Sequence, residues 1–496
     1  MSFNNGTVRI QELYTHMLEQ AGSKDLILLR FHPEKRLSVI VHDTQQFKED
    51  PTTPTRERHD DYEYKPFFNA IEKRSEQNKN LETITDITFH NPFEQQEQSL
   101  IEYMKSHHFG PDGEVHICVS GSRQQAFTCV IHDSTLGPPV GGLRAYDYAT
   151  DYPEDSIGAL LSDNLRLAEG MSYKAAISRT KTGGGKMVRQ KNKGETPEIR
   201  NLANFEVALA VTLTNYSRGR RQPNAYPPYY TAEDVGNNGN EMDYISRWTP
   251  FVICKTPLRG GGGNPSPYTA EGVYSCLLVA AKEAGLYKNK REPLSNVRIL
   301  LQGLGHCGEE VLQRIHEAGA QIIATDKNKE AIWRIQSNFR TSRRIHCEYF
   351  SEQTLHEDPN IFWRRHAKES DIALACALGG TWNPETLQIF KGTPIKIATG
   401  SANNQFSEQN PEQQAKEWKQ EEIIVPPDYL VNAGGLMRAV EEMPGRKILP
   451  SERTMTKVRG LTKDLQKVFD NARKENTTPW NACIQESRKR MKRNEK

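Results

Sequence analysis

A lysine at the end of a glycine run is the first feature of this sequence that could do chemistry. Gly183-Gly-Gly leads into Lys186, and Met-Val follows it. Such a loop brings its backbone close to a ligand while the ammonium group sits at an apolar edge. Burial disfavours the charged amine, so we expect the pKa of Lys186 to fall towards a range useful for proton transfer. Taken alone, a lysine is more often a solvated surface charge.

Carboxylates and amides form a second set of candidates. Thr231-Ala-Glu-Asp234-Val-Gly236 offers two adjacent carboxylates, and an extended segment can direct only one of them into a site. Amides beside glycines follow at residues 400–405 and 432–435. These types orient small polar groups in a binding site, although each segment read separately is also ordinary turn chemistry.

A glycine-rich turn carries the strongest single motif. Residues 293–301 and 321–325 are apolar runs typical of buried parallel strands, and residues 309–318 have the spacing of an amphipathic helix. Between strand and helix stands Gly303-Leu-Gly305-His-Cys-Gly308. Glycine allows a tight turn at the first position, close approach to a pyrophosphate at the second, and helix packing at the third. The unit therefore predicts a dinucleotide site at the start of the helix.

The acidic residue after the second strand indicates which dinucleotide binds. Asp326 lies 18 residues after Gly308, where a carboxylate accepts from a ribose 2′-hydroxyl and repels a 2′-phosphate. NAD is therefore favoured over NADP, although Lys327 and Lys329 keep NADP open.

Composition excludes several classes of protein. The chain has 496 residues and a formal net charge of +2, which is no footprint for nucleic acid or an anionic membrane. No apolar run is long enough for a membrane helix. Eight cysteines are scattered without a C-x-x-C pair, which favours reduced thiols in the cytoplasm, and no His/Cys cluster has metal-ligand spacing.

Alternating apolar runs and helical patterns from about residue 96, among them expected helices at 163–176 and 204–214, indicate an α/β protein. We expect two domains with a cleft between them. Residues 96–265 form a substrate and oligomerisation domain of the amino acid dehydrogenase-like type, on which residues 466–496 pack back. Residues 266–465 form a Rossmann-type NAD-binding domain.

Residues 1–95 read as an N-terminal extension. Residues 26–41 predict a hairpin around a His-Pro-Glu-Lys turn. A shift of 90 residues places Val39-Ile-Val-His-Asp-Thr44 on Cys129-Val-Ile-His-Asp-Ser134, which suggests a partial repeat of the start of the substrate domain. Chance similarity between short apolar patterns is the alternative.

Nine sequence blocks follow one another in a recognisable order. They are Leu136-Gly-Pro-Pro-Val-Gly-Gly-Leu-Arg144, Leu165-Arg-Leu-Ala-Glu-Gly-Met-Ser-Tyr-Lys174, Gly183-Gly-Gly-Lys186, Thr231-Ala-Glu-Asp-Val-Gly236, Pro265-Ser-Pro-Tyr-Thr-Ala270-Glu-Gly-Val-Tyr274, the turn at 303–308, Ala375-Cys-Ala-Leu-Gly-Gly380, Ser401-Ala-Asn-Asn-Gln405 and Pro427-Asp-Tyr-Leu-Val-Asn-Ala-Gly-Gly435. In this order, residues 97–485 resemble the leucine/phenylalanine/valine dehydrogenase branch of the glutamate dehydrogenase superfamily.

The resemblance implies roles for individual residues. Lys174 matches the lysine that binds the substrate carboxylate, and Lys186 the lysine that polarises the carbonyl and activates the attacking water. Asp234 matches the carboxylate that exchanges a proton with the substrate amine, and Thr269 the threonine that contacts the nicotinamide carboxamide. The other implied substrate contacts are Val140, Gly141, Gly142, Ala232, Asn403, Asn404, Asn432, Leu436 and Ala439. The other implied cofactor contacts are Gly303, Gly305, His306, Cys307, Gly308, Asp326, Ala377 and Asn404.

The resemblance also assigns four residues to the pocket for the substrate side chain: Val140, Ala232, Leu436 and Ala439. None of them can bind a γ-carboxylate, which argues against glutamate. Leucine, valine, isoleucine and phenylalanine remain open, because one methylene group changes binding by only about 1–3 kcal/mol.

Several features depart from the family pattern, and two of them concern charge. Arg438 stands where a short polar residue is usual, and an inward-pointing guanidinium would place a cation beside the cleft. Residues 487–496 hold six Lys or Arg among the last nine positions, which reads as a solvated tail or as a contact for an anionic partner.

The sequence thus predicts reversible, NAD-dependent oxidative deamination of an apolar L-amino acid to the 2-oxo acid and ammonia, by a homo-oligomer that needs no metal. The alternatives are a ligand-binding or regulatory protein on the same scaffold, and a dehydrogenase that accepts a larger or charged substrate through Arg438.

Overall fold

The computed structural model describes residues 25–32, 35–43, 100, 102–120, 125–219, 227–407 and 410–492. The contacts between residues divide the chain into two compact units. Unit 1 holds residues 1–172 and 181–263, and unit 2 holds residues 173–180 and 264–496. Of the predicted N-terminal extension, only the two strands fall within the described residues.

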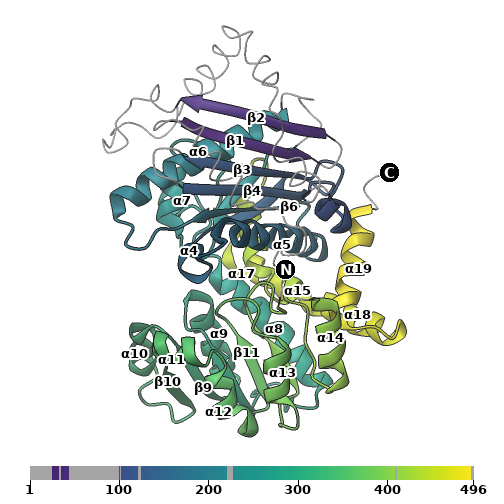
Figure 1. Ribbon diagram of the computed structural model, residues 1–496. Helices are drawn as coiled ribbons and strands as arrows, with labels where there is room; N and C mark the ends of the chain where they lie inside the picture. Colours follow the sequence, from purple (N-terminus) through teal and green to yellow (C-terminus); the bar gives the residue numbers. More distant parts are fainter. Residues whose placement is uncertain are drawn as a thin grey trace. The chain divides into compact units, whose positions relative to one another are not determined.

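Unit 1 is built on one mixed sheet, whose described strands run in the order β2-β1-β3-β4-β6-β5-β7. Figure 1 labels the first five of them, from β2 to β6. Neighbours from β2 to β6 are antiparallel, whereas β5 is parallel to both β6 and β7. The strands are β1 (Asp25–His32), β2 (Lys35–Asp43), β3 (Glu114–Ser120), β4 (Gln125–Asp133), β5 (Pro139–Tyr146), β6 (Gly183–Gln190) and β7 (Tyr230–Glu233).

The helices of unit 1 follow from local sequence signals. α7 begins with a capping box, in which the Asn238 side chain accepts from the backbone and the Glu241 carboxylate accepts from the N–H of Asn238 at 2.7 Å. α6 contacts β3 and β4. The elements are α4 (Tyr148–Asp151), α5 (Ser156–Ile177), whose last turn belongs to unit 2, α6 (Pro197–Gly219), α7 (Gly239–Ile245) and the 3₁₀ turn η4 (Pro257–Arg259).

Unit 2 contains a parallel sheet with described strands in the order β10-β9-β8-β11-β12. The chain winds outward from β8 to β10 and then returns to the other side of β8 with β11. In such a sheet, ligands bind at the carboxyl ends of the strands where the winding reverses. The strands are β8 (Arg298–Gln302), β9 (Gln321–Asp326), β10 (Ile345–Tyr349), β11 (Ile372–Ala375) and β12 (Ile397–Thr399).

α8 and a cluster of tryptophans organise the helix packing of unit 2. α8 contacts α9, α16, α17 and α18. A second core is built around three tryptophans. The ring centroid of Trp382 lies 5.6 Å from that of Trp363 and 5.5 Å from that of Trp418. The elements are α8 (Ser266–Glu283), α9 (His306–Glu317), α10 (Lys329–Asn338), α11 (Glu352–Glu357), α12 (Ile361–His366), η5 (Ala367–Glu369), α13 (Pro384–Phe390), α14 (Pro411–Gln420), α15 (Asp428–Val431), α16 (Gly434–Ala439), η6 (Val440–Glu442), α17 (Ser451–Arg459), α18 (Leu461–Lys474) and α19 (Pro479–Lys492).

Most expected elements are present, with shifted ends. The expected helices 163–176 and 204–214 lie inside α5 and α6, the helix 309–318 is α9, and the strand 321–325 is β9. The strand expected at 293–301 is wrong before Arg298. There the chain turns, and the N–H of Leu294 donates to the carbonyl of Ala318 at 2.9 Å, so these apolar residues are buried without joining the sheet.

The eight cysteines are free thiols, as their scattered positions predicted. None of the helices in the described part of the chain combines the length and the apolar character that a membrane span requires.

Candidate active site

Lys186 lies on β6, between β4 and β5, and not on the loop that its glycines predicted. Packing explains the glycines. A Cβ at Gly184 would collide with Ser172, and a Cβ at Gly183 with the carbonyl of Asp133. The loop prediction was wrong because the close approach of neighbouring elements, which cannot be read from the local sequence, is what requires glycine here.

Charged side chains from three adjacent strands or their ends meet at Lys186. Its Nζ lies 2.9 Å from Oδ2 of Asp234, the residue that follows β7. The same oxygen accepts a hydrogen bond from Nε of Arg144 on β5 at 3.1 Å. Arg144 also donates through Nη1 to Asp163 at 2.7 Å. The Lys186 side chain is only 3% exposed, so its amine is shielded from water.

The surroundings move the two central pKa values downwards. Burial lowers the pKa of Lys186, and the charge of Arg144 adds to this effect while Asp234 opposes it. Burial alone would raise the pKa of Asp234, but the charges of Lys186 and Arg144 outweigh it and hold that pKa well below its usual range. The site therefore pairs an ionised carboxylate with an amine that gives up its proton more readily than an exposed lysine, which is suitable for proton transfer.

The predicted substrate residues of β5 and β7 are neighbours in the sheet. Gly142 is paired with Ala232. A Cβ at Gly141 would collide with the carbonyl of Gly185, and one at Gly142 would lie 2.7 Å from Cβ of Asp234. The two glycines thus allow β5 to approach the Lys186 strand and the Asp234 carboxylate. Val140 and Ala232 are both buried.

Lys174 lies beside two of the predicted amides in unit 2. Its Nζ donates to Oδ1 of Asn403 at 2.7 Å, and the same oxygen accepts from Nδ2 of Asn432 at 3.1 Å. Asn404, the next residue, has a positive φ of 49°. A Cβ at Gly379 would lie 2.8 Å from the carbonyl oxygen of Asn404, so the two segments touch through their backbones.

Asp428 belongs to the same cluster, although the sequence analysis did not single it out. This buried carboxylate begins α15 and accepts from the backbone N–H groups of Asn404 and Gln405. Burial raises its pKa, and the charge of Lys174 opposes the rise. The sequence did contain a signal for Asp428. It lies four residues, about one helical turn, before Asn432, so the two side chains can share one face of a helix.

α16 presents Leu436 and Ala439, and both are buried. A Cβ at Gly435 would collide with Oγ1 of Thr269 on α8, so glycine lets α16 lie against this predicted cofactor residue.

Arg438 is directed away from a substrate role. Its Nη1 lies 3.0 Å from Oε2 of Glu441 and donates to the carbonyl of Leu449 at 2.8 Å. Its guanidinium also lies over the ring of Tyr268, 5.0 Å from the centroid. The guanidinium therefore forms a structural ion pair. The alternative of a charged substrate required an inward-pointing guanidinium, and these contacts do not supply one.

The turn after β8 has the geometry of a phosphate-binding loop. Gly303 has a φ of +99°, and a Cβ there would lie 2.7 Å from the carbonyl carbon of Cys376. A Cβ at Gly308 would collide with the carbonyl of Gly303, whereas one at Gly305 would meet no atom within 4 Å. The start of α9 receives no side-chain cap. Its first N–H groups and the open space at Gly305 therefore fit the pyrophosphate of a dinucleotide.

The remaining predicted cofactor residues surround this turn. Oδ2 of Asp326 accepts from the N–H of Leu304 at 2.6 Å, which fixes the carboxylate beside the turn at the end of β9. Ala377 is exposed in the segment after β11. His306 is the first residue of α9, and burial raises the pKa of the Cys307 thiol to about 12. The thiol is thus an inert packing group.

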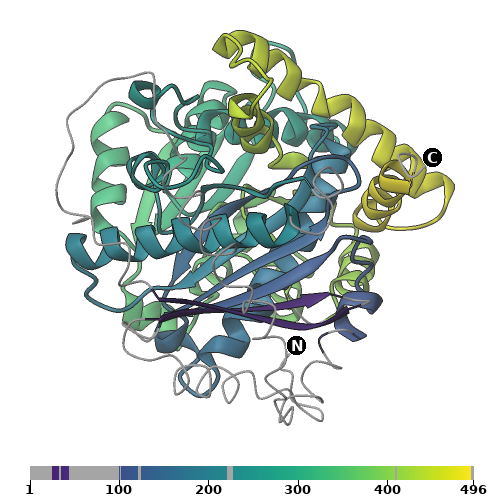
Figure 2. The same ribbon diagram turned by 90° about the horizontal axis from the view of Figure 1, so that it is seen from above.

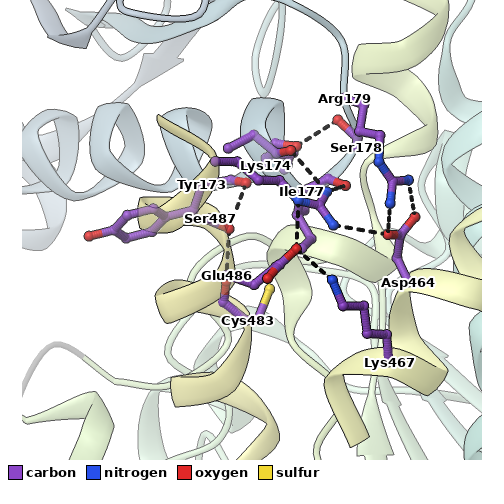
Figure 3. A network of polar contacts seen from close by, with 12 residues as sticks. Tyr173, Lys174, Ile177, Ser178, Arg179, Asp464, Lys467, Cys483, Glu486 and Ser487 are labelled. Atoms are coloured by element: carbon purple, nitrogen blue, oxygen red, sulfur yellow. Dashed lines mark hydrogen bonds and ion pairs between the residues drawn. The ribbon is translucent and has the colours of Figure 1, made fainter. Parts of the chain in front are cut away.

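The end of α5 that carries Lys174 is held by the C-terminal helix α19 (Figure 3). Arg490 donates to the carbonyls of Ala176 and Ile177 at 3.1 and 2.6 Å, and Ser487 Oγ donates to the carbonyl of Tyr173 at 3.3 Å. The solvated tail expected at residues 487–496 is therefore wrong for residues 487–492, and residues 493–496 lie outside the described residues.

The two units together define a class of protein: an α/β oxidoreductase with a buried lysine–carboxylate pair in one unit and a dinucleotide turn in the other. Within the described part of the chain, no group of three or more His, Cys, Asp or Glu side chains could hold a metal ion.

Comparison with known proteins identifies the family. Residues 122–250 match the family model described as the Glu/Leu/Phe/Val dehydrogenase dimerisation domain, and residues 260–493 match that of Glutamate/Leucine/Phenylalanine/Valine dehydrogenase. Leucine dehydrogenase from Thermoactinomyces intermedius is 35% identical over 367 residues, which are 74% of this chain and 87% of that protein. Phenylalanine dehydrogenase from Bacillus thermotolerans is 32% identical over 372 residues, 73% of this chain and 85% of that protein.

A solved structure agrees with these relatives. L-tryptophan dehydrogenase from Nostoc punctiforme matches with a TM-score of 0.54 and 25% identity, over 79% of this chain and 99% of that chain. The chain therefore belongs to the Glu/Leu/Phe/Val dehydrogenase family, on the side of its leucine and phenylalanine dehydrogenases. It is an amino acid dehydrogenase, an oxidoreductase that acts on CH–NH₂ groups, and the family predicted from the ordered sequence blocks is confirmed.

Proposed function

We propose that this chain catalyses the reversible, NAD-dependent oxidative deamination of an apolar L-amino acid to the 2-oxo acid and ammonia. The observation that carries the proposal is the buried Lys186–Asp234 pair at 2.9 Å, in which the pKa of the lysine is lowered. Nucleophilic attack of water on an imine needs a nearby base, and an amine with a lowered pKa supplies one more readily than an exposed lysine does.

Each polar group then has a defined task. Lys174, oriented by Asn403, binds the substrate carboxylate with its ammonium. Asp234 exchanges a proton with the substrate amine, and Lys186 accepts a proton from the attacking water. A bound nicotinamide supplies the hydride acceptor for Cα.

The substrate side chain is apolar. The residues that the resemblance assigns to the substrate side chain are buried within their units and carry no charge: Val140 and Ala232 in unit 1, Leu436 and Ala439 in unit 2. A substrate carboxylate placed against such residues would lose its hydration without gaining a partner. Leucine, valine, isoleucine and phenylalanine are therefore the substrates to test first.

NAD is the cofactor that Asp326 supports. Its carboxylate is fixed at the end of β9 by the N–H groups of Leu304 and Asn328, at 2.6 and 2.8 Å. A fixed carboxylate at this place accepts from a ribose 2′-hydroxyl and repels a 2′-phosphate.

The enzyme works as a homo-oligomer in the cytoplasm. The family description of residues 122–250 as a dimerisation domain supports the assembly. The eight free thiols favour a reducing compartment.

The deciding experiment incubates the purified chain with NAD and a panel of L-amino acids at alkaline pH, and follows NADH by absorbance. Lys186→Ala should lower kcat about 10²–10⁴-fold, because it removes the base. Lys193→Ala, a change at an exposed lysine just after β6, is the matched control and should leave the rate unchanged. The proposal would be contradicted if no amino acid produced NADH and if 2-oxo acids with ammonium consumed none. Binding of NAD without turnover in calorimetry would instead indicate a ligand-binding protein.

A further inference from the structure

The N-terminal hairpin repeats a hairpin inside the sheet of unit 1. β2 and β4 are both nine residues long, begin 90 residues apart, and end in His-Asp. Each is the second strand of an antiparallel pair, β1 with β2 and β3 with β4. The similarity first seen in residues 39–44 and 129–134 therefore extends to strand length and pairing.

The two hairpins are arranged as two copies related by a two-fold axis would be. The strand order β2-β1-β3-β4 reads second, first, first, second, and so is the same from both ends. The two first strands are antiparallel, with Leu28 opposite Cys118 and Leu29 opposite Ile117. Antiparallel pairing of identical edges is how a two-fold axis joins two copies of one sheet. Figure 2 shows the purple strands of the first hairpin continuing the blue strands of the second.

Without β1, strand β3 would be an edge of this sheet. A bare edge presents a row of unpaired N–H and C=O groups and invites pairing with another chain. Val115, Ile117 and Val119 alternate along one face of β3, and with β1 in place all seven residues of the strand are buried. Such a strand is suited to the middle of a sheet and not to an exposed edge.

The hairpin lies outside the part that the family models match. The first matched residue is 122, and about a fifth of this chain has no counterpart in the matching tryptophan dehydrogenase. The hairpin β1–β2 and the strand β3 that it covers therefore both precede the residues that the family models match.

We propose that the hairpin β1–β2 is an intramolecular substitute for the β3–β4 hairpin of a second copy of this chain, and that it closes the β3 edge against pairing between chains. The proposal concerns assembly and goes beyond the reaction. It predicts that displacing the hairpin creates a new self-association surface at β3.

A disulfide test asks whether the cover comes from the same chain. In the full-length protein, Leu28→Cys places a thiol opposite the native Cys118, within the Cα separation that a disulfide spans. After mild oxidation we expect a disulfide between position 28 and Cys118 within one chain, identified by peptide mass spectrometry and a monomer band on a non-reducing gel. Leu29→Cys, one residue along and on the other face, is the matched control and should stay reduced. Failure of the first variant to form this bond, or a bond that links two chains, would overturn the proposal.

A proline test asks what the cover prevents. Leu28→Pro removes an N–H from a strand that is paired on both sides, and should release the hairpin. We expect the mass measured by light scattering to rise at least twofold over wild type, because β3 then pairs with β3 of another chain. Leu28→Val, which suits a strand, should keep the wild-type mass. A released hairpin, seen as new protease cleavage in residues 25–43, with an unchanged or lower mass would contradict the proposal. Turnover is measured in parallel, so a failed dehydrogenase assay in all variants concerns the reaction and leaves the mass comparison intact.

Discussion

Arg144 is the residue through which the charges of the Lys186 site are coupled. It donates to Asp234 at 3.1 Å and to Asp163 at 2.7 Å, so it pairs with two half-buried carboxylates. It also adds a positive charge near Lys186, which lowers the pKa of that amine. The basicity of Lys186 is thus lowered by its burial and, in addition, by the charge of an arginine on the neighbouring strand.

Replacing this arginine should move the pH dependence in a defined direction. In Arg144→Met the repulsion on the Lys186 ammonium disappears, so its pKa rises and the neutral amine is reached only at higher pH. The acidic limb of kcat/KM against pH should therefore shift towards alkaline pH. Arg144→Lys keeps the charge and should bring the acidic limb most of the way back to its wild-type position. Arg247→Met changes an exposed arginine of unit 1 and should leave the limb where it is. A limb that stays in place in Arg144→Met would show that Arg144 does not control Lys186.

Asp428 should control the affinity for the substrate carboxylate. Its buried carboxylate interacts with the charge of Lys174 and is held by backbone N–H groups. Asp428→Asn keeps the shape and removes the charge, so the ammonium loses a compensating partner and its position. We expect KM for the amino acid to rise about tenfold, equivalent to about 1.4 kcal/mol, with KM for NAD unchanged. Asp470→Asn, at an exposed carboxylate of α18, is the control. Equal increases in both KM values would point to a general loss of structure.

At the scale of elements, α19 is a clamp on the end of α5. The last carbonyls of an α-helix lack partners within the helix, and here Arg490 satisfies those of Ala176 and Ile177. Arg490 also lies 3.2 Å from Asp464, which in turn holds Arg179 through two hydrogen bonds of 2.6–2.7 Å. The turn of α5 after Lys174 is thereby fixed by α18 and α19 together.

Removing the clamp should act on the substrate and not on the cofactor. Arg490→Leu breaks two hydrogen bonds from a charged group, each worth about 1.5–3 kcal/mol, and loosens the turn that carries Lys174. KM for the amino acid should rise several-fold while kcat and KM for NAD change little, and Arg490→Lys should recover part of the loss. If urea unfolding showed a loss of stability while KM for the amino acid stayed unchanged, Arg490 would have a purely structural role and the prediction would be wrong.

Local sequence accounted for the elements whose signals are contained in a short stretch. The turn at Gly303, the helix after it and Asp326 follow from the residues themselves, because each needs only its own backbone conformation and the next strand. The strand assignment of Lys186 could not be obtained in this way, since the glycines before it are required by the close approach of Ser172 and Asp133, which are distant in the sequence. The same holds for Arg438, whose direction depends on Glu441 and on the carbonyl of Leu449.

At the scale of the whole molecule, the two units contain separate cores, and the tryptophans report mainly on one of them. Trp363, Trp382 and Trp418 form the aromatic core of unit 2. Unit 2 also contains Trp480 and the exposed Trp333, whereas unit 1 contains Trp248. Chains with several cores often unfold in more than one step. Tryptophan fluorescence should therefore follow the unfolding of unit 2, while far-ultraviolet circular dichroism follows both units.

Binding of NAD should separate the two transitions, because the dinucleotide turn lies entirely in unit 2. At a concentration 100 times Kd, a ligand that binds only the folded form stabilises it by about 2.7 kcal/mol, which raises the melting temperature of a unit of this size by about 5–10 °C. We expect that shift in the fluorescence-detected melt, and a smaller one or none in the part of the dichroism signal that belongs to unit 1. NADP at the same concentration is the control and should shift neither, since its 2′-phosphate meets the fixed carboxylate of Asp326. Equal shifts by NAD and NADP would contradict the assignment of Asp326, and equal shifts of both transitions would mean that the two cores unfold as one.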